Sequence, residues 1–238
     1  MKFKLTPLEK KWVLYDVANS AFTLLVSTIM PIYFNYLAGR GGLSSVDYLA
    51  YWGYATSLVT ILVAVLGPTL GTLSDLRGRK KRFFLGSVLI GSVSCVVLGF
   101  MQSWLWFLGL FVISKTAYSS SLVFYDAMLP DVTEDSRVDE VSSYGYAWGY
   151  IGSCIPFGVC LVLVLAYESI GISMEAAMVI AFFIIALWWL LGAVPLLRSY
   201  RQIHYVEAQH EPVRDSFRRL GRVFSELGRR PDILFFLL

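Results

Sequence analysis

Residues 67–82 read GPTLGTLSDLRGRKKR and join a long uncharged stretch to a short, strongly basic loop. Gly67 and Gly71 have the G-x-x-x-G spacing that lets a neighbouring membrane helix approach closely. Gly78 can adopt a turn conformation that other residues avoid. Asp75 is the only acid in this stretch, so it is placed to pair with Arg79 or to cap the next helix. The stretch therefore predicts a tight hairpin between two membrane helices.

The composition of the whole chain also indicates a membrane protein. Of its 238 residues, 57% are hydrophobic and only 16% are charged, whereas a soluble domain has about 25% charged residues. The wealth of apolar and aromatic residues excludes a disordered chain. The three cysteines are odd in number and lie in apolar runs without metal-ligand spacing, which excludes a disulfide scaffold and a cysteine metal site.

Five uncharged stretches are long enough to cross a bilayer, which takes about 20 residues. The third, joined to the uncharged residues after Lys115, has about 43 residues and predicts two crossings with a tight turn near residues 102–104. Six membrane helices are therefore expected in an all-α bundle, and the first is too long for a cleaved signal peptide. The five stretches are residues 17–39, 48–74, 83–114, 141–167 and 176–197.

Basic residues are distributed unevenly around these six spans. When the spans alternate in direction, all but two of the 20 lysines and arginines lie on the side of the amino terminus, and the exceptions are Arg40 and Lys115. The positive-inside rule assigns that side to the cytoplasm. The sequence therefore predicts a multi-pass protein with a cytoplasmic amino terminus.

The end of the chain differs from the predicted six-helix unit of residues 1–198. Residues 199–230 are polar and basic and predict a cytoplasmic linker. Residues 231–238 begin with proline and continue with apolar residues, as the start of a seventh helix would, but about two turns cannot cross a bilayer. We therefore expect the chain to lack a carboxy-terminal half.

The basic loop resembles the signature loop between spans two and three of the Major Facilitator Superfamily, although Leu76 stands where a basic residue is usual. The resemblance implies that this chain is one half of a twelve-helix transporter. It also implies that the loop latches the two halves and controls their swing between outward-open and inward-open states, with latch roles for Asp75 and Arg79. The alternative is an ordinary short cytoplasmic hairpin, basic and rich in glycine. The matching positions are Gly71, Asp75, Gly78, Arg79, Lys81 and Arg82.

Three other segments resemble a narrower branch, the relatives of the fungal vacuolar amino-acid effluxer that is linked to autophagy. They are residues 12–22, 124–131 and 145–152. This resemblance implies a vacuole-effluxer-like transporter in a bacterial-type plasma (inner) membrane. It also implies small zwitterions such as amino acids as cargo, although the residues themselves identify no substrate.

Two charged residues fall within the predicted spans, where a charge costs about 2.5–3.5 kcal/mol and marks a candidate functional site. Asp16 is predicted one turn into the first span, and Lys115 near the bilayer centre in the fourth, about 15 Å from its cytoplasmic end. In the resembled fold both spans line a central cavity, so the predicted substrate and proton pathway is Asp16, Asn19, Lys115 and Tyr118. Asp16 and Lys115 are also candidates for an ion pair with each other. The alternatives are a helix cap at the headgroups for Asp16, and a structural pair or a cavity-solvated group without a transport role for Lys115.

Small and acidic residues mark two further features. Gly145, Gly149 and Gly152 give the fifth span a small-residue face, which we expect to pack against a neighbouring helix. Contact with substrate at an interrupted helix is the alternative. Asp126, the acid closest to the membrane in the loop before this span, is predicted to pair with the basic loop after span two.

No catalytic set, cofactor motif or metal-ligand spacing is visible in the sequence. The arginine-rich tail predicts contact with anionic lipid rather than nucleic acid. We therefore expect a secondary transporter, not an enzyme, that moves a small solute by alternating access, with proton coupling through Asp16 as a hypothesis. The alternatives are a non-transporting scaffold or a membrane-embedded enzyme of this fold. The apolar stub at residues 231–238 argues against a half-sized transporter that dimerises.

Overall fold

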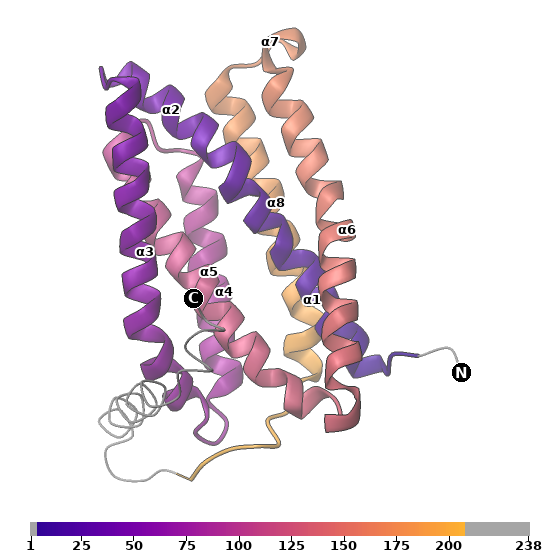
Figure 1. The fold of residues 1–238 in the computed structure, drawn as a ribbon. Helices are drawn as coiled ribbons and strands as arrows, with labels where there is room; N and C mark the ends of the chain where they lie inside the picture. The colour runs from indigo at the N-terminus through magenta and orange to yellow at the C-terminus, as the bar shows by residue number, and fades with distance from the viewer. Residues whose placement is uncertain (1–3, 208–238) are drawn as a thin grey trace, which may run out of the picture.

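The computed structural model describes residues 4–207, and these form an all-helical bundle apart from one isolated β-bridge. Six of its helical segments are long and apolar enough to cross a membrane, which confirms the predicted fold class and number of spans. Figure 1 shows them as an elongated bundle with the loops at its two ends. Most of the predicted linker, residues 208–230, and the predicted start of a seventh helix, residues 231–238, lie outside the described residues.

The first span is one long helical segment in three parts, followed by five more spans. Its parts are α1 (Pro7–Leu24), the π-helical turn η1 (Leu25–Ile29) and α2 (Met30–Arg40). The remaining elements are α3 (Ser45–Ser74), α4 (Lys80–Leu98), α5 (Trp104–Val132), the 3-10 turn η2 (Asp135–Arg137), α6 (Val138–Leu165), the short helix α7 (Tyr167–Ile170) and α8 (Met174–Ser199).

Helix α1 begins about ten residues before the uncharged stretch that predicted it. Thr6 and Glu9 form a capping box, and Pro7 occupies the first turn, where its missing N–H costs nothing. Asp16 therefore lies about 14 Å along the helix, at 1.5 Å per residue, rather than one turn from its end. The sequence placed Asp16 only one turn into the span, because the charged first turns that extend the helix outside the apolar layer give no hydropathy signal.

The hairpin of α4 and α5 turns at residues 99–103, where the sequence predicts a tight connection. Helix α5 continues to Val132, beyond the end of its uncharged stretch at Tyr125. Lys115 consequently lies about 16 Å from the outer end of α5 and about 25 Å from its cytoplasmic end. It is deeper in the protein, measured from the cytoplasm, than the sequence suggested.

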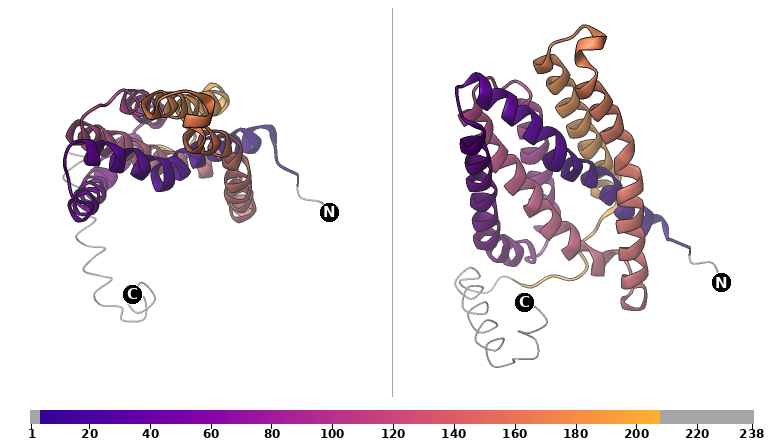
Figure 2. Two further views of the ribbon diagram at one scale, coloured as in Figure 1. Left: turned by 90° about the horizontal axis from the view of Figure 1, so that it is seen from above. Right: turned by 45° about the horizontal axis from the view of Figure 1, so that its top comes forward.

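The π-helical turn η1 interrupts the first span close to its middle. Pro31 follows it and has no N–H to donate to a carbonyl of the preceding turn, which is a common cause of irregular helix geometry. Figures 1 and 2 show α1 and α2 crossing the bundle obliquely. Helix α1 packs mainly on α6 and α8, whereas α2 contacts α3 and α5, so this span joins the two sides of the bundle.

Large aromatic side chains fill the centre of the bundle. Trp189 of α8 is fully buried, and its indole N–H donates to the Tyr15 hydroxyl at 3.1 Å. Trp12 stacks on Tyr125 with ring centroids 4.3 Å apart and links α1 to α5. These contacts hold the inner face of α1 against α5 and α8.

The predicted small-residue face of α6 lies against α1. A Cβ added to Gly145 would be 2.8 Å from the Trp12 ring, and one added to Gly149 would be 3.0 Å from Ser20 Oγ. At Gly152 an added Cβ would overlap Val17. The three glycines therefore allow a backbone approach that no larger residue permits.

Replacing Gly152 by valine is expected to destabilise the protein by about 1–3 kcal/mol, the usual cost of overpacking. The measurement is the apparent Tm of the purified protein in detergent, which should fall by several degrees. Gly158→Val is the matched control, because it lies on the same helix and an added Cβ there meets nothing within 4 Å. An equal loss in both variants would contradict the packing role of this glycine face.

Candidate functional site

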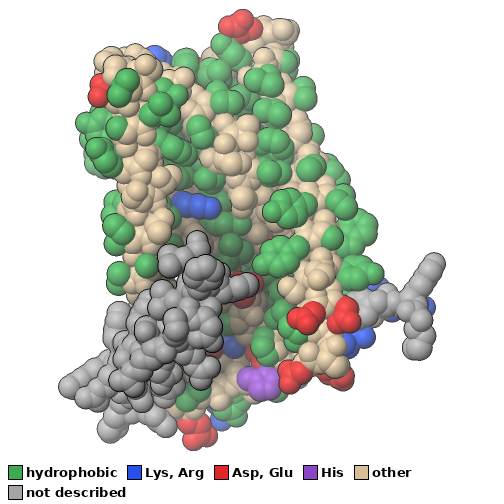
Figure 3. Space-filling view, in the orientation of Figure 1, with side chains coloured by type: hydrophobic (Ala, Val, Ile, Leu, Met, Phe, Trp, Pro, Cys, Tyr) green, Lys and Arg blue, Asp and Glu red, His purple; other side chains and the backbone are tan. Residues whose placement is uncertain are grey.

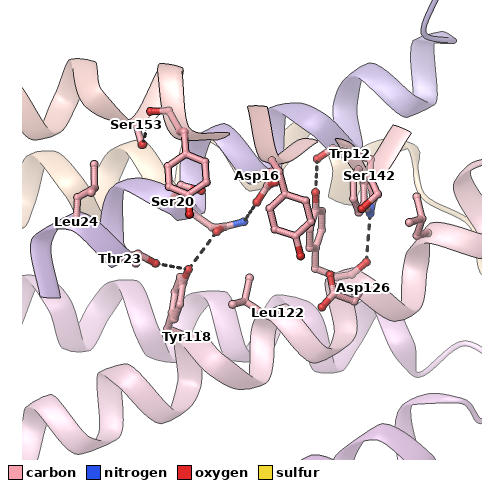
Figure 4. A pocket seen from close by; sticks show the side chains of 15 residues that line it. Trp12, Asp16, Ser20, Thr23, Leu24, Tyr118, Leu122, Asp126, Ser142 and Ser153 are labelled. Carbon is pink, nitrogen blue, oxygen red and sulfur yellow. Dashed lines mark hydrogen bonds between the residues drawn. The ribbon is translucent and has the colours of Figure 1, made fainter. Parts of the chain in front are cut away.

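A cavity of about 220 Å³ lies between α1, α5 and α6, and its lining is both polar and aromatic. Figure 4 shows side chains from these three helices facing the same space. Three of the four residues predicted for the substrate pathway line it, namely Asp16, Asn19 and Tyr118. The structure therefore brings most of the predicted site together at one place inside the membrane span.

Asp16 is 8% exposed and lies at the wall of this cavity. Its Oδ1 accepts a hydrogen bond from the Asn19 amide at 3.2 Å. The Tyr118 hydroxyl donates to Asn19 Oδ1 at 3.2 Å and lies 2.7 Å from the Thr23 hydroxyl, which must then act as donor because Tyr118 has one proton. A continuous polar chain thus connects the carboxylate on α1 to α5.

The glycine face of α6 also shapes the surroundings of Asp16. A Cβ on Gly145 would lie 3.1 Å from Asp16 Oδ2, and one on Gly149 would lie 3.3 Å from the same oxygen. The glycines therefore leave the room that the carboxylate occupies between the two helices. The sequence offers helix packing and a functional site as alternatives for these glycines. At the contact between α6 and α1 the glycines pack closely and also border the Asp16 carboxylate.

Lys115 does not line the cavity. Its ammonium lies over the Tyr118 ring, 4.6 Å from the centroid, in a cation–π contact. Among residues 4–207 no acidic side chain forms an ion pair with it. Tyr118 contacts Asn19 and Thr23, and Lys115 lies nearly one helical turn further outward, so the ion pair with Asp16 considered from the sequence does not form.

Asp126 is a cavity residue that the sequence analysis assigned elsewhere. It lines the same cavity as Asp16 and makes no ion pair with the basic loop in the described part of the chain, so the predicted pairing is wrong. The loop instead pairs with Asp131, about one and a half turns further along α5. The spacing of Tyr118, Leu122, Tyr125 and Leu129, all in the lining, places Asp126 on this helix face, and that periodicity was the available signal.

The basic loop after α3 forms its own network at the cytoplasmic end. Lys80, which is 4% exposed, lies 3.6 Å from both Asp75 Oδ1 and Asp131 Oδ2 and donates to the Ala127 carbonyl at 2.9 Å. The partner of Asp75 is therefore Lys80, and the predicted pairing with Arg79 is wrong. Lys80 is the first residue of α4, and side chains of a helix tilt toward its amino terminus. This direction brings the Lys80 ammonium to the cytoplasmic end of α5.

The other loop residues predicted to form a latch have simpler surroundings. Gly78 has φ +72°, so the turn uses the left-handed conformation that glycine adopts without strain. Arg79, Lys81 and Arg82 are exposed, and Gly71 lies partly buried beside α5. Their roles in latching two halves stay a prediction.

Residues 200–206, at the start of the predicted linker, run along the same loop. Val206 N–H donates to the Asp75 carbonyl at 2.9 Å, and Gln202 Oε1 accepts from Gly78 N–H at 2.9 Å.

Asp131 accepts hydrogen bonds from the Tyr200 hydroxyl at 2.5 Å and from His204 N–H at 2.7 Å. Burial and the hydrogen bond to Asp131 raise the pKa of Tyr200, so it remains a donor well into the alkaline range. We call residues 200–206 the strap.

Two more polar contacts fasten the ends of the first span. At the cytoplasmic end, Arg137 donates to both carboxylate oxygens of the buried Glu9, at 3.0 and 2.8 Å. At the outer end, Arg40 and Tyr36 both contact the carboxylate of Glu175 on α8. Each contact links the first span to a different part of the bundle.

Comparison with known proteins identifies the family. Residues 39–238 match the family described as vacuole effluxer Atg22 like. The chain belongs to this family. It is also 38% identical over 243 residues to an uncharacterized MFS-type transporter, YxiO, of Bacillus subtilis (strain 168). This match covers the whole chain but 57% of the relative, so the chain spans little more than half the length of that curated protein.

These similarities confirm the predicted superfamily and branch and support an amino-terminal half of the facilitator type. In this Atg22-like chain the cavity and the loop network occupy different levels of α5. Tyr118 and Asp126 face the cavity, and Asp131 holds Lys80 and the strap. One helix therefore carries both the candidate binding residues and the anchor of the cytoplasmic network.

Lys80→Met is expected to lower the free energy of unfolding by about 2 kcal/mol, because it removes a charged hydrogen bond and two ion pairs. Thermal unfolding in detergent measures this loss. Arg79→Met is the matched control, since Arg79 is exposed and its side chain makes no ion pair in the part of the chain that the structure describes. A larger loss for Arg79→Met than for Lys80→Met would contradict the observed pairing.

Proposed function

We propose that this chain forms the amino-terminal half of a secondary transporter, which moves a small solute through the Asp16 cavity by alternating access. The observation that carries the proposal is a carboxylate buried beside a polar cavity within a membrane span. Burying a charge there is costly and is favoured where it serves a substrate or ion pathway. The family and the MFS-type relative point in the same direction.

The proposal assigns different roles to the four predicted pathway residues. Asp16 binds the solute or the coupling proton, while Asn19 and Tyr118 hold its carboxylate in a fixed orientation. Lys115 lies behind Tyr118 rather than in the cavity, and its contact with the ring makes it a positioning residue. Support for transport therefore rests on Asp16 more than on Lys115.

Coupling to protons follows from the lining of the cavity. Among the described residues, the lining has no lysine, arginine or histidine. The lining therefore cannot neutralise a charged Asp16. Either a proton or a positively charged group of the solute must do so. We propose that exchange of these two cations on Asp16 links proton movement to solute movement.

The proposed setting is a bacterial-type plasma membrane with the amino terminus in the cytoplasm. Figure 3 shows most charged side chains at the two ends of the molecule and hydrophobic ones between them, as expected for a protein that crosses a bilayer. The basic loop, the strap and the start of α1 all lie at the same end in Figure 1. The second half of the transporter is proposed as the partner of this chain, since the relative is longer.

A scaffold or a membrane-embedded enzyme is the competing proposal. A scaffold needs no polar cavity beside a buried carboxylate. Among residues 4–207 no group of three or more histidine, cysteine, aspartate or glutamate residues is placed to hold a metal ion. The transporter proposal accounts for the cavity, whereas a scaffold leaves it without a role.

Asp16→Asn is expected to reduce solute uptake driven by a pH gradient at least tenfold, because the amide cannot exchange a cation. The assay uses proteoliposomes that contain the complete transporter with its second helical half. Asp139→Asn is the matched control, as this acid is exposed in the first turn of α6, outside the cavity. Uptake by Asp16→Asn at the wild-type rate, with no loss in the control, would refute the proposed mechanism.

The proposed orientation predicts opposite labelling of two exposed positions. In a background without the exposed Cys154, Val46→Cys near the start of α3 should react with a membrane-impermeant maleimide added to intact cells. Ser136→Cys in the turn before α6 should react only after the cells are opened. The reverse pattern would place the amino terminus outside.

A further inference from the structure

We infer that the cavity selects solutes that carry a protonated amine or another compact organic cation, and that Asp16 and Asp126 bind this group together. The inference rests on the proposed function, because it names the substrate class of the same site. Four properties of the cavity support it: its charge, its free hydrogen-bond acceptors, its aromatic lining and its size.

The charge of the lining is negative. Asp16 on α1 and Asp126 on α5 both line the cavity, and no basic side chain in the described residues shares the lining with them. Two carboxylates around one small space repel each other unless a cation lies between them. The cavity therefore attracts a positive group and disfavours an anion.

Free acceptors remain on both carboxylates. Oxygen Oδ1 of Asp16 is occupied by Asn19, whereas its Oδ2 accepts no hydrogen bond from residues 4–207, although the side chain is more than nine-tenths buried. Asp126 is an exposed residue, and no hydrogen bond or ion pair engages its carboxylate within the same range of residues. A protonated amine has up to three N–H donors and can satisfy these acceptors together with hydroxyls such as that of Ser142.

Aromatic side chains complete the lining. Trp12 and Tyr125 are fixed as a stacked pair, because each donates a hydrogen bond from its ring group to the backbone carbonyl of the other, both at 3.2 Å. Tyr146 and Tyr150 of α6 are exposed members of the same lining. Carboxylates combined with aromatic rings are the usual means of binding an organic ammonium group.

The contact of Lys115 shows that an aromatic ring beside this cavity already accepts an ammonium ion. Its Nζ lies 4.6 Å from the centroid of Tyr118, while Phe22 stacks on the same ring at 4.8 Å. Tyr118 therefore offers the cavity its hydroxyl rather than a free ring face. The exposed rings of the lining are those of Tyr146 and Tyr150 on α6, whereas the stacked Trp12 and Tyr125 are buried.

The size of the cavity limits the bound group. Its volume of about 220 Å³ is below the roughly 300–1,000 Å³ of pockets that enclose drug-sized ligands. A small amine or the ammonium end of a longer solute fits this space. The same chemistry accommodates the ammonium group of a zwitterion, so the test must separate cations from zwitterions and anions.

Binding of probe ions to the complete transporter in detergent tests the inference without requiring transport. The probes are butylammonium and choline as cations, 4-aminobutyrate as a zwitterion, and butyrate as an anion of matched size. The readout is the quenching of tryptophan fluorescence at constant ionic strength, since Trp12 lies in the lining. We expect saturable binding of the cations, binding of 4-aminobutyrate through its ammonium group, and at least tenfold weaker binding of butyrate, which has no such group.

Two variants assign the binding to the carboxylates. Asp16→Asn and Asp126→Asn should each weaken cation binding at least tenfold, while Asp139→Asn should leave it unchanged and an unaltered Tm should show that the variants fold. Butyrate binding as well as the cations, or Asp126→Asn binding cations like the wild type, would overturn the inference.

The same measurements separate this inference from the proposed function. Proton-driven uptake that depends on Asp16, in a protein that binds no cation, would refute the substrate class and leave transport intact. Cation binding that depends on both carboxylates, in a protein without uptake, would support the site and refute transport.

Discussion

Burial of the Asp16 carboxylate is the constraint on which the arrangement of the bundle depends. A charged group on a membrane helix is costly to expose to lipid, so α1 must turn this side chain inward. The adjacent wall is the glycine face of α6, which leaves room for the carboxylate, and the opposite wall is the polar chain through Asn19 to Tyr118. Helices α1, α5 and α6 all contribute to accommodating this one polar group.

Charged side chains are also buried at the cytoplasmic end, where an ion pair and hydrogen bonds compensate their charges. Lys80 and Asp131 are both almost fully buried, and each has additional hydrogen bonds besides the ion pair that they share. Buried ion pairs are stable only when such extra bonds compensate the loss of hydration. Because the strap supplies several of these bonds to Asp131, this segment after α8 is an integral part of the loop network.

Much of the fold could be predicted from the sequence because apolar length, charge asymmetry and glycine spacing are local signals. Six spans and a hairpin close to residues 99–103 follow from them, whereas the family was indicated by the resemblance of the basic loop and of three other segments. The errors concern side-chain partners, which depend on the rotation and depth of whole helices. Asp75 pairs with Lys80 instead of Arg79, and Asp126 faces the cavity while Asp131 binds the loop. Helical periodicity places Asp126 and Asp131 on different faces of α5, but the neighbour that each face meets is fixed only by the axial rotation of the helix.

The π-helical turn in the first span has a geometric consequence for the whole bundle. A π turn holds one residue more than an α turn, so the side chains beyond η1 are rotated by about 100° relative to an uninterrupted helix. The stripe that α1 presents to α6 and α8 is thereby replaced, in α2, by one that meets α3 and α5. One additional residue thus lets a single span pack against two different sets of helices. Deleting that residue would rotate the contact face of α2 away from α3 and α5.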